Sequence, residues 1–316
     1  MAHKRRRKKG SKKAGGMHIV SKPSFGERKF LYISFALSIG ICLLLMGVYM
    51  PGTGQEQMQE VMGAAIEPVE YGSNYPYTRA DFNTVLENAL EINLSQMDVE
   101  YTITDAGDYL LYGDYEGRIC IDAEEQIVHL FLNNVNIMSP SGPAIDIQAA
   151  GKVIITVMDN TSNAIQDKAY YRKQDEEDAA IYSNCDLSFN GNGVLSVYGL
   201  YNKGIHSKDI IKILGGDISI QAKGDGIQGN DGICLSPTTL SIESEGHGLY
   251  TKKTGNENKG TIEISGGDIQ IIAGENAVSS SKDLYVSNCS LWINSVLDAF
   301  HVSGSAYLME GCIENE

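Results

Sequence analysis

The second half of the chain repeats itself with a period of about 22 residues, and this repeat constrains the fold more than any other feature. Each repeat begins with an apolar residue, and successive leading residues lie 36, 24, 22, 22, 29 and 22 positions apart. The two large excesses fall in the polar stretches NTSNAIQDKAYYRKQDEED and TKKTGNENKG, which we interpret as loop insertions into a coil of constant length. The leading residues are Ile145, Ile181, Ile205, Ile227, Leu249, Val278 and Phe300.

Within each coil the apolar residues follow one pattern, at positions 0, 6, 8, 13 and 15 from the leader. The coils that begin at Ile205, Ile227 and Val278 are aliphatic at all five positions. Spacings of two predict strands with alternate residues inward, and the gaps, rich in Gly, Asn, Asp and Ser, predict turns. Coils this short leave no room for a helix, so we expect parallel strands stacked about 4.8 Å apart. The sequence therefore predicts an all-β fold, a right-handed parallel β-helix.

The N-terminal region has a different character. Residues 1–29 hold 11 Lys or Arg and one acid, whereas the rest of the chain holds 14 basic and 39 acidic residues. Residues 30–50 contain no charge and are long enough to cross a bilayer as one helix. The positive-inside rule then puts residues 1–29 in the cytoplasm and the β-helix outside, as a single-pass plasma-membrane protein. A cleaved signal peptide is the alternative, and beside a membrane span the basic run favours lipid over nucleic acid as its partner.

The remaining chain divides into a linker, a cap and the repeats. Residues 51–77 are mostly polar and are interpreted as a linker. Residues 78–140 are expected to form an N-terminal helix and strand cap with the first coils, since TRADFNTVLENALEI has the apolar spacing of an amphipathic helix. Residues 141–316 are the β-helix repeats.

Equivalent residues of successive coils should stack, so the residue after each leader should form an outward column. Aromatic and planar polar side chains in such a column suit a polysaccharide, which needs stacking surfaces and hydrogen-bonding groups. Trp292 also points outward by parity, and the column residues are Tyr182, His206, Gln228, Tyr250, Ser279 and His301. The alternative interpretation is that exposed Tyr and His are simply favourable strand residues.

A second column is acidic and precedes the second strand of each coil. Stacked carboxylates repel unless protons, bases or a cation intervene, and outside the cell calcium is the expected cation. The candidate calcium ligands are Asp186, Asp209 and Asp231, with Asp283 in the same column and Asp225 beside the turn. The alternative is a solvated acidic edge paired with Lys203, Lys208 and Lys212.

Residues 101–300 contain a set of motifs: YTITDAGDYLLYG, GRICID, VHLFLNNVNI, DEEDAAIYSNCDLSFNGNG and the repeated GIHSKD and ILGGDISI units. On these motifs the region resembles the bacterial carbohydrate-binding β-helix proteins that bind cellulose and polygalacturonate, calcium-containing relatives in shape of the pectate lyases. This resemblance implies an extracytoplasmic, calcium-binding, lectin-like module without catalysis.

No common catalytic motif is present in the sequence, so the expected function is non-catalytic binding of plant or cell-wall polysaccharide at the cell surface. The first alternative is a calcium-dependent pectate-type lyase, with Lys208 or Lys212 as the base beside Asp209. The second is a structural adhesin that binds another surface protein. The sequence gives no oligomeric state.

Overall fold

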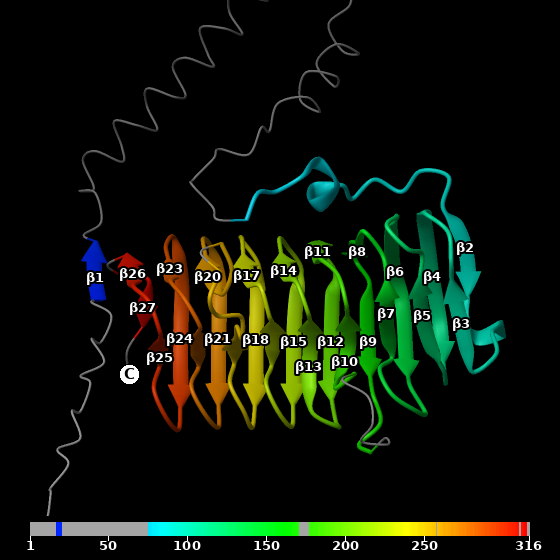
Figure 1. The fold of residues 1–316 in the computed structure, drawn as a ribbon. Coiled ribbons are helices and arrows are strands. Elements are labelled where there is room, and N and C mark those ends of the chain that lie inside the picture. The colour runs from blue at the N-terminus through cyan, green and yellow to red at the C-terminus, as the bar shows by residue number, and fades with distance from the viewer. Residues whose placement is uncertain (1–16, 21–74, 171–176, 257, 310, 315–316) are drawn as a thin grey trace, which may run out of the picture. The chain divides into compact units, whose positions relative to one another are not determined.

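The computed structural model describes residues 17–20, 75–170, 177–256, 258–309 and 311–314. Residues 17–20 and 78–314 belong to one compact unit, and residues 75–77 belong to a second. In the first unit the strands form two sheets in which every strand pair is parallel, and successive coils follow one another along the solenoid (Figure 1). The predicted parallel β-solenoid is confirmed.

The nine-stranded sheet holds the strands that contain the leading residues, and we call it the leader sheet. Its strands are β3 (Glu100–Ile103), β5 (Arg118–Asp122), β7 (Ile145–Ala149), β10 (Ala179–Ser183), β13 (Lys203–Ser207), β16 (Ile227–Gly229), β19 (Leu249–Tyr250), β22 (Val278–Ser280) and β25 (Phe300–Val302).

The larger sheet supplies two strands to each regular coil. The first series is β2 (Leu90–Asn93), β4 (Gly107–Tyr115), β6 (Ile127–Met138), β8 (Lys152–Val157), β11 (Leu187–Gly191), β14 (Ile210–Ile213), β17 (Gly232–Leu235), β20 (Thr261–Ile264), β23 (Leu284–Val286) and β26 (Ala306–Met309). The second series is β9 (Ser162–Gln166), β12 (Val194–Gly199), β15 (Asp217–Ala222), β18 (Thr239–Ser244), β21 (Gly267–Ala273), β24 (Cys289–Ser295) and β27 (Ile313–Glu314).

The core consists of interior files that run along the solenoid. The leading residues pair in register from Ile145 to Phe300, so they form the single file that the repeat predicts. All are fully buried except Phe300 in the last coil, which is half-buried. The equivalent files of the larger sheet, such as Ile220, Ile242 and Ile271, are also in register and buried. Burial of these aliphatic side chains is the main stabilising contribution to the fold.

Two kinds of glycine fit this packing. A Cβ atom on Gly226 would lie 2.3 Å from Cγ2 of Ile242, so this glycine, next to a leader, leaves room for an isoleucine of the interior. In the Gly-Gly pairs at 215–216 and 266–267 the second glycine, Gly216 or Gly267, has a positive φ of 95° or 93°. That backbone conformation favours glycine, as expected at a sharp turn between strands.

The expected amphipathic helix in the cap is wrong. The chain forms a 3-10 turn, η1 (Arg79–Phe82), continues without helix to β2, and forms a second 3-10 turn, η2 (Leu94–Gln96), after it. Phe82, Val85 and Leu90, which the helix would have buried, are 45%, 58% and 56% exposed. A polar contact determines this conformation: the buried carboxylate of Asp81 fixes the turn against the larger sheet.

We call residues 78–83 the N-terminal strap, because they bond to three successive coils. Asp81 is 0% exposed and accepts hydrogen bonds from Lys152 Nζ of β8 at 2.8 Å and Ser188 Oγ of β11 at 2.6 Å, with Lys212 Nζ of β14 at 3.5 Å. Asn190 Nδ2 donates to the carbonyl oxygens of Asp81 and Asn83. Burial alone would raise the pKa of Asp81, but these partners hold it at about 2.

The first predicted insertion is shorter than expected. Its initial part forms strand β9, in which Ile165 is buried and pairs in register with Val197 of the next coil. The insertion therefore follows β9 and ends at β10. The polar residues around Ile165 hid the apolar pattern of a strand, because β9 has one inward aliphatic side chain.

At the other end of the solenoid, β1 (Met17–Val20) pairs in parallel with β26. None of the helices in the described ranges is long and apolar enough to span a bilayer, and residues 30–50 lie outside those ranges.

A buried histidine near the N-terminal coils should make stability depend on pH. His129 is 3% exposed, its Nε2 lies 2.6 Å from Thr156 Oγ1, and burial lowers its pKa to about 4. Since the unfolded chain takes up this proton near pH 6.5 and the folded chain near pH 4, stability should fall by roughly 3 kcal/mol as the pH drops through this window. We expect His129→Gln to flatten this part of the profile in urea unfolding at several pH values. An unchanged slope in the variant would contradict the assignment.

Candidate carbohydrate-binding site

The predicted outward column lies on the leader sheet. Tyr182, His206, Gln228, Tyr250, Ser279 and His301 are consecutive partners in the strand register. The column also extends toward the N-terminal end through Asp146 and Cys120. Its alignment was predicted correctly, but its exposure is not uniform along the solenoid.

The first half of the predicted column is covered. Tyr182, His206 and Gln228 are only 2%, 6% and 4% exposed. His206 Nδ1 lies 2.6 Å from a carboxylate oxygen of Asp178, Gln228 Nε2 lies 3.1 Å from His206 Nε2, and the rings of Tyr182 and His206 meet edge to face. Lys203 pairs with Asp178 as well. Burial alone would raise the pKa of Asp178, but His206 and Lys203 hold it at about 2.

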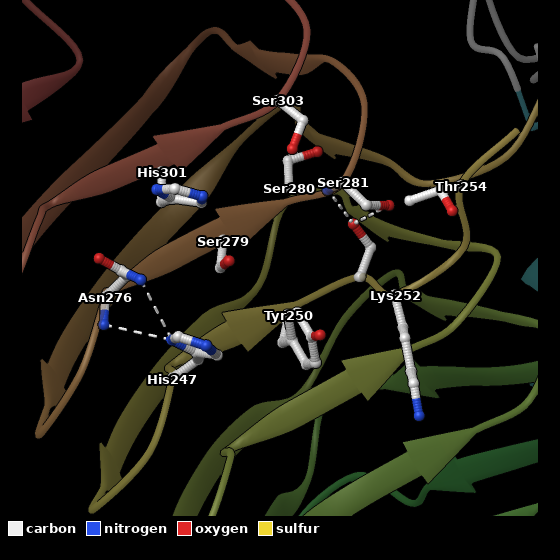
Figure 2. A pocket seen from close by; sticks show the side chains of 11 residues that line it. His247, Tyr250, Lys252, Thr254, Asn276, Ser279, Ser280, Ser281, His301 and Ser303 are labelled. Carbon is white, nitrogen blue, oxygen red and sulfur yellow. Dashed lines mark hydrogen bonds between the residues drawn. The ribbon is translucent and has the colours of Figure 1, made fainter. Parts of the chain in front are cut away.

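In the second half of the column Tyr250 is half-buried and His301 is exposed, while Ser279 between them is 6% exposed. Tyr250, Ser279 and His301 line a cavity of about 340 Å³, which we call the ladder pocket (Figure 2). Turn residues form one side and the loop after β19 forms the other. The remaining lining residues are His247, Thr251, Lys252, Thr254, Asn276, Ser280, Ser281 and Ser303.

One wall of the pocket is held by His247. Its Nδ1 accepts a hydrogen bond from the backbone N–H of Asn276 at 3.2 Å, and its Nε2 lies 3.1 Å from a Glu275 carboxylate oxygen. Its ring centroid is 4.9 Å from that of Tyr250. Burial, with the negative charges of Asp225 and Glu275, raises the pKa of Tyr250, so its hydroxyl stays a neutral donor and acceptor.

The opposite wall is the second insertion, residues 251–260. Thr251 Oγ1 donates to the carbonyl oxygen of Gly260 at 2.8 Å and accepts from the backbone N–H of Ser281 at 2.9 Å. Ser281 Oγ in turn donates to the carbonyl oxygen of Lys253 at 2.6 Å. These bonds bring Lys252 and Thr254 to the pocket (Figure 2).

Sequence reasoning missed the two walls. Its column comprised only strand positions, whereas His247 and Asn276 precede the leaders and Lys252 and Thr254 belong to the insertion. The available signal was that a long insertion begins directly after the column residue Tyr250.

Trp292 does not join the ladder pocket. It is half-buried on β24 of the larger sheet, where its register partner is Gln270. Nearby on the first series of that sheet, the rings of Tyr285 and Tyr307 stack with centroids 4.7 Å apart. These aromatic residues occupy other strands than the column, so the predicted binding set is divided between the two sheets.

The acidic column is only partly as predicted. The backbone N–H of Asp231 donates to the carbonyl oxygen of Asp209, which stacks these two residues. Burial, with the charges of Asp231 and Asp186, raises the pKa of Asp209. The bases that relieve this repulsion come from the second insertion: Lys259 bonds to Asp231, and Lys253 Nζ lies 3.7 Å from it. They are not the lysines expected from the sequence.

Asp186 and Asp225 are placed differently. Asp186 accepts a hydrogen bond from the backbone N–H of Ile210, one position away from the Asp209–Asp231 register. Asp225 lies on the turn before β16, where its carboxylate accepts the backbone N–H of His247 at 2.9 Å. Asp225 therefore supports a wall of the ladder pocket and does not join the other candidate ligands.

These positions do not offer calcium a ready site. Among the described residues no group of three His, Cys, Asp or Glu side chains is arranged to hold a metal ion. Lys259 bonds to Asp231, so a cation at the stacked carboxylates would first have to displace this ammonium group.

The two lysines considered as lyase bases are also engaged. Lys212 is 3% exposed and its ammonium group faces Asp81 of the N-terminal strap. Lys208 Nζ lies 5.9 Å from the ring centroid of Tyr182. Because Lys212 is buried, it cannot reach a substrate at the surface, and its assignment as a lyase base is wrong.

The ladder pocket is suited to binding rather than to hydrolysis. None of its described lining residues is Asp or Glu, so the paired carboxylates of glycoside hydrolysis are not available there. Its hydroxyls, amide, imidazoles and ammonium group can bond to ligand oxygens, and the Tyr250 ring offers an apolar surface.

Comparison with known proteins agrees with this chemistry. Residues 97–306 match a family model described as carbohydrate-binding domain-containing protein. A protein of Acetivibrio thermocellus with the same description is 30% identical over 256 residues, which cover 79% of this chain and 90% of that protein.

A solved structure shares the fold. It is described as a polysaccharide lyase-like protein from C. thermocellum, in a gadolinium derivative. The two superpose with a TM-score of 0.68 at 28% sequence identity, over 71% of this chain and 97% of the other.

Proposed function

The chain belongs to the family of carbohydrate-binding domain-containing proteins, and on that premise we propose that it binds a polysaccharide in the ladder pocket without cleaving it. The family predicted from the sequence is thereby confirmed. The observation that carries the proposal is that Tyr250 and His301 are the accessible residues of the outward column among those the structure describes from Tyr182 to His301, with the buried Ser279 between them as the pocket floor, and that flanking side chains also converge there.

The proposed ligand is a plant or cell-wall polysaccharide of the cellulose or polygalacturonate kind. The chain after residue 29 carries 39 acidic and 14 basic residues, and this excess repels an acidic glycan at long range. The pocket lining differs, because it contains Lys252, His247 and His301 and none of its described residues is acidic. Tyr250 suits a neutral glucan, and Lys252 suits a uronate.

Replacing Tyr250 by alanine tests the proposal directly. Loss of the ring removes the apolar surface and one hydroxyl, so affinity should fall about tenfold or more. Affinity gel electrophoresis on cellulose derivatives and polygalacturonate, followed by calorimetry, measures this. Tyr198→Ala is the matched control, because Tyr198 is also half-buried but lies on β12 of the larger sheet. Equal affinity of wild type and the Tyr250 variant would refute the proposed site.

Calcium assistance is proposed only for an acidic glycan, where the ion would bridge a uronate to the stacked carboxylates of Asp209 and Asp231, which do not line the ladder pocket and would have to release Lys259. We then expect EDTA to weaken binding to polygalacturonate about tenfold and to leave cellulose binding unchanged. Asp209→Asn should reproduce the EDTA effect, while Asp268→Asn, at an exposed position on β21, should not. If neither EDTA nor Asp209→Asn changes the affinity for polygalacturonate, calcium assistance is ruled out.

The lyase-like name of the solved relative keeps a lyase as the rival function. Incubation of the protein with polygalacturonate and calcium, followed at the absorbance of unsaturated products, separates the two. Product at enzymatic rates would overturn non-catalytic binding. A structural adhesin, the other alternative, predicts no retention on any glycan.

We propose the cell surface as the location, on the strength of the charge pattern around residues 30–50. Whole-cell protease treatment should release the β-helix while the basic N-terminus stays with the membrane fraction. Recovery of the intact chain in the soluble fraction would contradict this.

A further inference from the structure

The covered and open parts of the outward column meet abruptly. Gln228 and Tyr250 are register partners on adjacent strands, yet Gln228 is 4% exposed while Tyr250 lines the ladder pocket. A sugar chain lying along the column from the C-terminal coils would therefore meet Tyr250 as its last accessible position.

The covered part is not an empty groove that a sugar could enter by displacing water. Asp178 bonds to both His206 and Lys203, His206 lies next to Gln228, and Gln228 Nε2 donates to Asn230 Oδ1 at 2.5 Å. The pKa of Asp178, about 2, reflects this pairing. Entry of a ligand would expose or break a charged, largely buried network, and that costs more than a neutral contact regains.

The open part is short. The pocket spans two steps between coils, from Tyr250 through Ser279 to His301, which at the usual strand spacing is about 10 Å. Its volume of about 340 Å³ is at the lower end for small-molecule sites. Ser279 is 6% exposed and forms the floor between the two larger side chains.

From this geometry we propose that the ladder pocket binds the end of a polysaccharide chain and not an internal segment. The terminal unit lies against Tyr250 and His247, and the chain leaves past His301 toward the last coil. This inference rests on the proposed function and specifies the ligand: a free chain terminus of roughly two or three sugar units.

Calorimetry with two series of oligosaccharides tests the proposal. The probes are cello-oligosaccharides and oligogalacturonides of roughly two to six units, each also modified with a bulky group at one end or the other. We expect affinity to level off at about three units, and modification at one end to abolish binding while modification at the other does not. Affinity that climbs more than about tenfold from three to six units, or tolerates both modifications, overturns chain-end binding.

Two matched variants provide a second readout. His301→Gln changes an open position and should weaken binding about threefold to tenfold, whereas His206→Gln changes a covered position of the same column and should leave affinity within about twofold. Equal weakening by both, with thermal unfolding unchanged, overturns the proposal. If neither oligosaccharide series binds, the proposed function itself fails, so the two failures are distinguishable.

Discussion

Replacing Asp81 by alanine should lower the free energy of unfolding by roughly 3–5 kcal/mol. The carboxylate is fully buried and is the shared partner of Lys152 and Lys212, which are themselves only 8% and 3% exposed. Its removal leaves two ammonium groups near each other without their shared anion. It also removes the acceptor of Ser188 Oγ and of the Thr78 backbone N–H.

Urea unfolding at neutral pH measures this loss. Asp268→Ala, at an exposed position on β21, is the control and should change stability by less than about 0.5 kcal/mol. Exchanging all three charged residues together, Asp81→Leu with Lys152→Met and Lys212→Met, should recover part of the loss, because both buried ammonium groups are removed together with the carboxylate that they share. A single Asp81 variant as stable as wild type would show that the N-terminal strap is not anchored by this ion cluster.

The second large effect is expected at Ile242, whose truncation to alanine should cost roughly 2–5 kcal/mol. The side chain is 1% exposed, belongs to the interior file of Ile220 and Ile271, and its Cγ2 fills the space that a side chain on Gly226 would need. Rigid strands on both sides limit how far the resulting cavity can collapse.

The adjacent residue supplies the control. Glu243 is exposed on the same strand, so Glu243→Ala should lie within about 0.5 kcal/mol of wild type. Comparable losses at both positions would mean that the alternation of inward and outward residues on β18 is misassigned. Chemical denaturation of both variants against wild type decides this.

The repeat predicted the solenoid well because its signal is redundant. An inward file such as Ile205, Ile227 and Val278 recurs at constant spacing, and a shift of one residue would turn a whole strand inside out. The N-terminal cap carried no such redundancy. Phe82, Val85 and Leu90 have helical spacing, but Asp81 outweighs it through buried contacts with residues 71 and 131 positions away.

The sequence predicts that the site residues align in one column, but not which of them line a pocket. Register follows from spacing, so the order of Tyr182, His206, Gln228 and Tyr250 was correct. Burial of an outward side chain depends on what else lies over it, and Asp178, which bonds to His206, comes from a region with no repeat. For the same reason the sequence could not show that Lys259, in an insertion, neutralises Asp231.

The N-terminal strap changes how this solenoid should melt. In a linear array each coil contacts only its neighbours, so disorder can enter at an end and advance one coil at a time. Here Asp81 and Asn190 link the N-terminal strap to the coils of β8, β11 and β14. If one of these coils frays, the strap is also released from the other two. These coils should lose amide-exchange protection together, as one cooperative block within an otherwise zipper-like molecule.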